Sequence, residues 1–162
     1  MTRRQTIQSL TTSLAALGFG AGWAKAAAPA EVFEVTKTDA EWKALLSPAA
    51  YATLRHEATE RPGTSPFNTE KRKGIFNCAG CDLPLYDSST KYESGTGWPS
   101  FFDHLTNAIG TKNDNTLFST RTEVHCRRCG GHLGHVFEDG PKPTGLRYCM
   151  NGVALKFAPA AA

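Results

Sequence analysis

Cys78-Ala79-Gly80-Cys81 and Cys126-Arg127-Arg128-Cys129 are two Cys-x-x-Cys knuckles, and together they hold four of the five cysteines in this 162-residue chain. Two such knuckles supply the four thiolates of a tetrahedral zinc site. The predicted ligands of one structural Zn²⁺ per chain are Cys78, Cys81, Cys126 and Cys129. With four thiolate ligands, the metal keeps no open position for an activated water. We expect the knuckles at the ends of hairpins, which the metal pins together.

Other uses of the knuckle cysteines also fit the sequence. In an exported protein both knuckles can close as disulfides, and a single Cys-x-x-Cys can act as a redox pair. A Cys₂His₂ site built on the second knuckle would leave the first knuckle without a role. The 44 residues between the knuckles, and the glycine beside a cysteine in each, favour one shared metal.

The first 26 residues have the pattern of an export signal. Arg3 and Arg4 precede an apolar run at 14–23, and Ala24-Lys25-Ala26 matches the small-x-small cleavage pattern. The run is too short and too rich in glycine for a stable membrane span. The paired arginines favour the twin-arginine route to the periplasm. An ordinary secretory signal is the alternative, and the protein is cytoplasmic if the signal is not used.

The mature chain is predicted to be a single globular domain. It comprises a linker at 27–37, the domain at 38–158 and a tail at 159–162. Hydrophobic residues make up 40% of the sequence and charged residues 20%, which argues against disorder. Removal of 1–26 takes away three basic residues and no acid, so the formal charge falls from +3 to zero. The mature domain therefore has no basic field that would attract nucleic acid.

Two short helices are expected at the start of the domain. Thr38-Asp39-Ala40-Glu41 is a capping-box pattern, and apolar residues follow it at helical spacing. Ser47 and Pro48 then fit the cap and first position of a second helix, which would run to about Thr59. Two prolines and a glycine within 61–67 end the helical pattern.

A twisted antiparallel β-core is expected from Lys73 onward, where short apolar or aromatic runs alternate with turn residues. A polar turn is expected at 113–115. The expected strands are 74–77, 116–119, 122–125, 135–137, 147–149 and 153–157.

Cys149 has no partner once the knuckles bind metal, so it is a candidate nucleophile. Arg147, Cys149 and Asn151 are spaced by two and would share one face of a strand. A free thiol has a pKa of about 8.5 and is mostly protonated at neutral pH. We expect the guanidinium of Arg147 to lower the pKa of Cys149 and make the thiolate the majority form. A buried, inert cysteine is the alternative.

His132 and His135 are the candidate acids. They are three residues apart and would face opposite sides of a regular strand, one in the core and one at the surface. A bulge at Gly134 would turn both to one side. Trp98, between a glycine and a proline, is expected on a loop, where it can wall a pocket, although tryptophan is more often a core residue.

The chain resembles the type B methionine sulfoxide reductases from about Trp42 to Phe157. Besides the two knuckles, the resemblance is carried by 61–67, Gly97-Trp98-Pro99-Ser100-Phe101, 131–137 and 147–151. It implies a mainly β fold of two antiparallel sheets with short N-terminal helices, stapled by the zinc site. It also implies catalytic roles for Cys149, His135, His132, Arg147 and Asn151, and substrate-binding roles for Trp98 and Phe137.

The activity implied by this resemblance is reduction of methionine-R-sulfoxide in oxidised proteins and peptides. The Cys149 thiolate attacks the sulfoxide sulfur, a histidine (His135 in preference to His132) protonates the departing oxygen, and Cys149 becomes a sulfenic acid. Many members carry a resolving cysteine where this chain has Thr96. We therefore expect an external thiol such as thioredoxin to regenerate Cys149. The protein is expected to be a monomer.

Two other classes of function remain open at this point. A zinc-ribbon-like binding module would leave Cys149 inert. A cysteine–histidine hydrolase would need an oxyanion hole and an orienting acid, and the sequence has no clear signature of either.

Overall fold

The computed structural model describes residues 31–116 and 120–161. The expected export signal at 1–26 lies outside the described residues, as do residues 27–30 of the linker, residues 117–119 of an expected strand and residue 162 of the tail. The signal therefore stays a prediction. No helix within the described ranges has the length and apolar character needed to cross a membrane.

Both expected helices are present: α1 (Asp39–Leu45) and α2 (Pro48–His56). The capping box forms, since the Thr38 hydroxyl accepts a hydrogen bond from the Glu41 amide at 3.3 Å and the Glu41 carboxylate accepts one from the Thr38 amide at 2.7 Å. Helix α2 ends three residues earlier than expected. The reason is that Glu57 adopts a left-handed backbone (φ 56°), which closes the helix.

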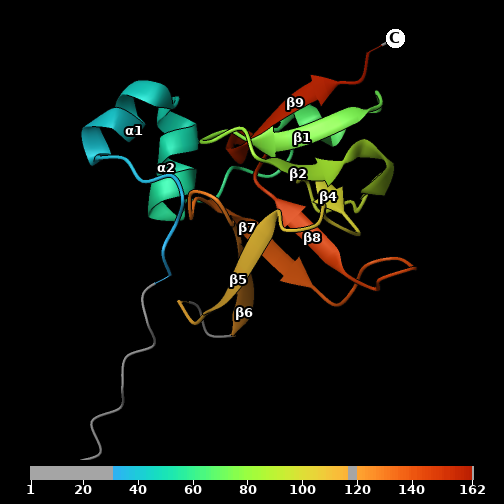
Figure 1. The fold of residues 1–162 in the computed structure, drawn as a ribbon. Helices are drawn as coiled ribbons and strands as arrows, with labels where there is room; N and C mark the ends of the chain where they lie inside the picture. Colours follow the sequence, from blue (N-terminus) through green and yellow to red (C-terminus); the bar gives the residue numbers. More distant parts are fainter. Residues whose placement is uncertain (1–30, 117–119, 162) are drawn as a thin grey trace, which may run out of the picture. The chain divides into compact units, whose positions relative to one another are not determined.

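The strands of the described residues form two antiparallel sheets, as predicted, with the two helices beside them (Figure 1). The three-stranded sheet has the order β2 (Pro84–Asp87), β1 (Gly74–Cys78), β9 (Leu155–Pro159). The six-stranded sheet has the order β3 (Lys91–Tyr92), β4 (Ser100–Phe101), β8 (Arg147–Met150), β7 (His132–Phe137), β6 (Arg121–Cys126), β5 (Ile109–Asp114). Short 3₁₀ turns are η1 (Pro66–Asn68), η2 (Ser88–Thr90) and η3 (Gly152–Ala154).

Three local expectations were wrong. Residues 113–114 were predicted as a turn, but they pair with Thr122 and Arg121 at the end of β5, where an outer strand tolerates polar side chains. Strand β8 ends at Met150, so Asn151 lies outside the strand and precedes η3, although it lines the same pocket as Cys149. The first two residues of the expected strand at 153–157 belong to the 3₁₀ turn η3, and only residues 155–157 are extended, in β9.

Aromatic side chains from both sheets fill the core between them. Tyr86 of β2 stacks on Phe101 of β4 with ring centroids 4.3 Å apart, and Phe76 of β1 packs against Phe101 at 5.0 Å. Such pairs contribute about 0.5–1.5 kcal/mol each beyond the burial of their area. Tyr148 and Met150 of β8 are buried. The alternation of side chains along a strand therefore turns Cys149 to the opposite face.

Candidate active site

The four knuckle sulfurs form a compact group, here called the cysteine cluster (Cys78, Cys81, Cys126 and Cys129). All four lie within 4.8 Å of one another. The sulfurs of Cys78 and Cys129 are 3.7 Å apart, and those of Cys81 and Cys126 are 3.5 Å apart. The disulfide alternative pairs the cysteines within each knuckle, but the structure has all five cysteines free, so neither knuckle is closed as a disulfide. The two sulfur–sulfur separations match the edges of a tetrahedron of thiolates, which are about 3.8 Å long for metal–sulfur bonds of about 2.3 Å.

The cluster joins a hairpin of each sheet, which confirms the expected position of the knuckles. Cys78 ends β1 and Cys81 lies in the turn to β2, whereas Cys126 ends β6 and Cys129 lies in the turn to β7. Neither candidate histidine belongs to the group. The cysteine cluster is thus a group of four cysteines that could hold a metal ion, at a point where one hairpin of each sheet meets the other.

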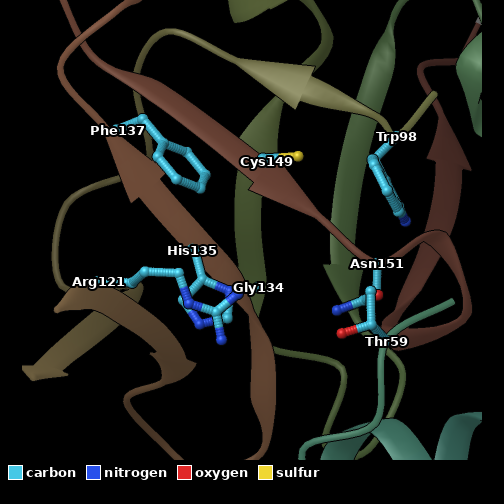
Figure 2. Close-up of a pocket in the computed structure, with 8 residues that line it drawn as sticks. All are labelled: Thr59, Trp98, Arg121, Gly134, His135, Phe137, Cys149 and Asn151. Atoms are coloured by element: carbon cyan, nitrogen blue, oxygen red, sulfur yellow. The ribbon is translucent and has the colours of Figure 1, made fainter. Parts of the chain in front are cut away.

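Cys149 lies in a separate pocket of about 120 Å³. Figure 2 shows its sulfur between the rings of Phe137 and Trp98, with the remaining side chains grouped below. The lining residues are Thr59, Trp98, Arg121, Gly134, His135, Phe137, Cys149 and Asn151. Of these, His135, Cys149 and Asn151 were predicted as catalytic residues, and Trp98 and Phe137 as substrate-binding residues. Thr59, Arg121 and Gly134 were not predicted as site residues.

The register of β8 sets the neighbours of Cys149. On one side it pairs directly with His135 of β7, and on the other with Ser100 of β4. Directly paired residues share a face of the sheet, with Cβ atoms about 4.5–5.5 Å apart. Glycine at position 134 permits the close approach of β7 to β8, because a Cβ there would clash with the carbonyl oxygen of Cys149.

His132 and His135 lie on the same side of β7, with ring centroids 5.4 Å apart. The pairing of β6 with β7 shifts beside Gly134: Val124 pairs with Gly134, but the next residue of β6, His125, pairs with His132. This extra residue of β7 is a bulge, and it reverses the alternation of side chains. The sequence-based prediction that a bulge turns both histidines to one side is confirmed.

His135 is held by a carboxylate. Its Nε2 lies 2.8 Å from Asp114 Oδ2, which also accepts a hydrogen bond from Arg121 at 2.6 Å. Hydrogen bonds from Thr116 lower the pKa of Asp114, and the bond with His135 lowers it further, so Asp114 is an anion and Nε2 carries the proton. Burial lowers the pKa of His135, which makes the neutral ring the main form at neutral pH. Its Nδ1 is then the atom able to accept a proton.

The prediction that Arg147 makes Cys149 a thiolate was wrong. The guanidinium of Arg147 pairs with both carboxylate oxygens of Asp139, each at 2.8 Å, and lies 4.4 Å above the ring of Phe137. Burial raises the pKa of Cys149; the Thr96 hydroxyl and the Arg147 charge oppose this rise without reversing it. The resting protein therefore holds Cys149 as a thiol, and Arg147 fixes the pocket wall at Phe137.

Asn151 and Trp98 are both tied to the segment after α2. Asn151 donates to the carbonyl of Leu133 at 3.1 Å and accepts from the Glu60 amide at 2.8 Å. Trp98 lies on a loop, as expected, and its Nε1 donates to the Glu60 carbonyl at 2.9 Å. Both of these bonds join the Asn151 amide to backbone groups, so Asn151 holds the wall of the pocket together.

Several acids near the site were not predicted from the sequence. Asp114 was assigned to a turn and Asp139 follows a strand with no recognisable pattern. Glu123 accepts a hydrogen bond from buried His132 at 2.8 Å. A signal for Glu123 did exist, because Glu123 and His125 are two apart in an expected strand and share a face. The partners of the two aspartates follow only from the tertiary fold.

The fold and the site define a class of protein: two antiparallel sheets with a four-cysteine cluster where their hairpins meet, and a separate cysteine that lines a small pocket together with a histidine. Residues 46–159 match the SelR domain. The chain belongs to the SelR domain family.

Curated relatives in this family are similar over most of the chain. A protein named peptide methionine sulfoxide reductase MsrB from Agrobacterium fabrum is 50% identical over 127 residues, covering 78% of this chain and 94% of that protein. One of the same name from Methanosarcina barkeri is 52% identical over 124 residues, covering 76% and 87%. Peptide methionine sulfoxide reductase B1, chloroplastic, from Arabidopsis thaliana is 51% identical over 117 residues, covering 72% and 58%.

The cysteine cluster is predicted to be required for stability. Cys126→Ser should lose bound metal and unfold at a lower temperature, because structural metal in small domains contributes about 10–16 kcal/mol of apparent binding energy. Elemental analysis and thermal unfolding of purified protein measure both effects. Cys149→Ser is the matched control and should keep its metal. A Cys126→Ser protein that is metal-free, fully stable and active would contradict the structural role.

The reactivity of Cys149 is predicted to increase with pH. Because the pKa of Cys149 is raised, its thiolate fraction at a given pH is smaller than that of an ordinary thiol, whose pKa is about 8.5. The measurement is alkylation of the metal-loaded protein by iodoacetamide, mapped by mass spectrometry. The rate at Cys149 should be slow at pH 7 and should still increase above about pH 8.5, the pKa of an ordinary thiol. Cys149→Ser should remove the label. A rate that levels off below about pH 8 would show that the pKa of Cys149 is lower than the ordinary value of about 8.5, and it would refute the prediction.

Proposed function

We propose that this protein is an oxidoreductase that reduces methionine-R-sulfoxide in peptides and proteins to methionine, with Cys149 as the redox centre. The observation that carries the proposal is the pairing of Cys149 with His135 inside a small, partly aromatic pocket. Family membership and about 50% identity to enzymes named as peptide methionine sulfoxide reductases support it.

The neutral state of both groups suggests how the proton moves. The Cys149 thiol must lose a proton to become nucleophilic, and the sulfoxide oxygen must gain one as it leaves the methionine sulfur. His135 is neutral, lines the same pocket as Cys149 and retains Nδ1 as a proton acceptor. In the proposed reaction His135 takes the thiol proton and delivers it to the oxygen, while Asp114 stabilises the transient imidazolium.

The first half-reaction transfers one oxygen atom and two electrons. The Cys149 sulfur attacks the sulfoxide sulfur and forms a transient sulfur–sulfur bond. That bond and the methionine sulfur–oxygen bond then break as the protonated oxygen bonds to the Cys149 sulfur, which leaves methionine and a sulfenic acid. Methionine sulfur is reduced by two electrons and Cys149 sulfur is oxidised by two. The rings of Trp98 and Phe137, between which the sulfur lies in Figure 2, provide apolar contact for the substrate methyl group.

Regeneration is proposed to need an external thiol of the thioredoxin type. The thiol attacks the sulfenic sulfur, water leaves, and a second thiol breaks the resulting mixed disulfide to restore Cys149. Thr96, whose hydroxyl oxygen lies 3.8 Å from the Cys149 sulfur, occupies the position from which a resolving cysteine would act. The other four cysteines of the chain belong to the cysteine cluster.

We infer that the metal of the cysteine cluster is zinc. Four thiolates in a tetrahedral arrangement are its typical structural ligands. When bound by Cys78, Cys81, Cys126 and Cys129, zinc would supply folding energy and no catalytic position. The chemistry of the pocket then falls to the side chains around Cys149.

Turnover of the two sulfoxide epimers tests the proposed function. We expect reduction of a methionine-R-sulfoxide peptide by dithiothreitol, little reduction of the S epimer, and none of either by Cys149→Ser. His135→Asn should lower kcat by about 10²–10⁴-fold, the usual contribution of a positioned acid or base. Asp114 also provides the orienting acid that a cysteine hydrolase needs, so an ester substrate belongs in the assay. Ester cleavage without sulfoxide turnover would overturn the proposal.

The absence of a resolving cysteine is tested by Thr96→Cys. After one turnover without reductant, wild-type protein should carry one added oxygen on Cys149 and no intramolecular disulfide, as read by intact mass and peptide mapping. In Thr96→Cys the introduced thiol should instead form a disulfide with Cys149, because the side chains at these positions already touch. Thr96→Ser is the matched control. A disulfide from Cys149 to the cysteine cluster in wild-type protein would contradict the external-thiol route.

A further inference from the structure

A buried carboxylate, Glu123 of β6, holds two histidines on the pocket side of the six-stranded sheet. Its side chain is 3% exposed. Oε1 lies 2.8 Å from Nδ1 of His132, and Oε2 lies 3.1 Å from Nδ1 of His125. Burial by itself would raise the pKa of Glu123, but hydrogen bonds from the two histidines outweigh it and bring the pKa to about 2. Glu123 is therefore an anion that can only accept hydrogen bonds.

An anionic acceptor determines which nitrogen of His132 carries the proton. Nδ1 must be the donor to Glu123, so Nε2 is the basic nitrogen whenever the ring is neutral. His132 is 3% exposed, and its Nε2 is buried with no hydrogen-bond partner among the described residues. An unsatisfied buried polar atom is destabilising and needs an explanation. The ring of His135 is 5.4 Å away, and it lines the pocket of Cys149.

We propose that Glu123 is a positioning residue for sulfoxide reduction: it holds His132 as the Nδ1–H tautomer, so that Nε2 of His132 can exchange a proton with the pocket. This inference rests on the proposed function. It gives the two histidines different tasks. His135, bonded through Nε2 to Asp114, lines the pocket of Cys149, and His132, whose ring centroid is 5.4 Å from that of His135, provides a second proton-exchanging nitrogen.

Other charges face this group and bear on its pH dependence. Lys112 of β5 lies 3.8 Å from Oε2 of Glu123 and also pairs with Glu57, which follows α2, at 2.7 Å. Beyond His132 lie His135 and its partners Asp114 and Arg121. His125 is adjacent to the cysteine cluster, and the inference does not depend on its titration.

The tautomer of His132 can be measured in the wild-type protein without any assay of activity. In ¹⁵N NMR spectra of the metal-loaded protein labelled at histidine, with His132 assigned by comparison with His132→Asn, we expect a protonated Nδ1 and an unprotonated Nε2 at pH 8. The Nδ1 proton should exchange slowly because the site is buried. An Nε2–H tautomer, or rapid reorientation of the ring, would overturn the proposal.

The kinetic test removes the charge of Glu123 and keeps its shape. Glu123→Gln should lower kcat for the sulfoxide peptide by about 10- to 100-fold, the usual effect of removing a carboxylate that orients a histidine. Its pH–rate profile should also differ from that of the wild-type protein, because the negative charge beside His132 is gone. The matched control is Glu57→Gln, an exposed carboxylate on the same lysine, and it should leave the profile unchanged.

A double variant shows whether Glu123 acts through His132. If it does, adding Glu123→Gln to His132→Asn should change neither kcat nor the pH profile further. Fully additive losses, or an unshifted profile in Glu123→Gln, would refute a positioning role. Should Glu123→Gln fail to fold, the NMR measurement decides alone. If the wild-type protein reduces no sulfoxide, the proposed function fails. That outcome is distinguishable from a failure of this inference, because the NMR measurement of the His132 tautomer does not depend on activity.

Discussion

The register of β7 against β8 is the constraint on which the candidate site depends. It sets His135 opposite Cys149, and a shift by one residue would turn every side chain of the strand to the other face of the sheet. Glycine at position 134 allows the two backbones to approach, and the bulge beside it brings His132 to the same side. The reacting sulfur thus lies on a central strand, where neighbouring strands restrict its position more strongly than a loop would.

The cysteine cluster supports this register from a distance. It joins the turn after β1 to the turn after β6, and β6 is the strand that carries Glu123 and pairs with β7. The five cysteines therefore have two separate tasks. Four hold the sheets at one end, and the fifth lies in a pocket that the cluster does not line.

Local signals in the sequence were sufficient for much of the fold. The Thr38–Glu41 capping box, the Ser47 cap and the knuckle spacing each depend on residues close in sequence, and all were predicted correctly. The partners of the site side chains are set by burial and by strand order, which a single sequence does not specify. Arg147 illustrates this limit: its spacing from Cys149 correctly indicated a charge that lowers the pKa of the thiol, but neither the larger effect of burial nor the bond from the guanidinium to Asp139 could be predicted.

The raised pKa of Cys149 fits oxygen transfer better than a resting thiolate would. The proposed reaction needs a proton on the oxygen at the moment the sulfur–oxygen bond breaks, and a neutral thiol brings that proton into the pocket with the nucleophile. Burial disfavours the separated thiolate and imidazolium in the resting protein. Two carboxylates, Asp114 and Glu123, bind the histidines that would move the proton. Their negative charges are thus already in place to stabilise an imidazolium in the transition state, while the thiol and the imidazole of the resting protein are neutral.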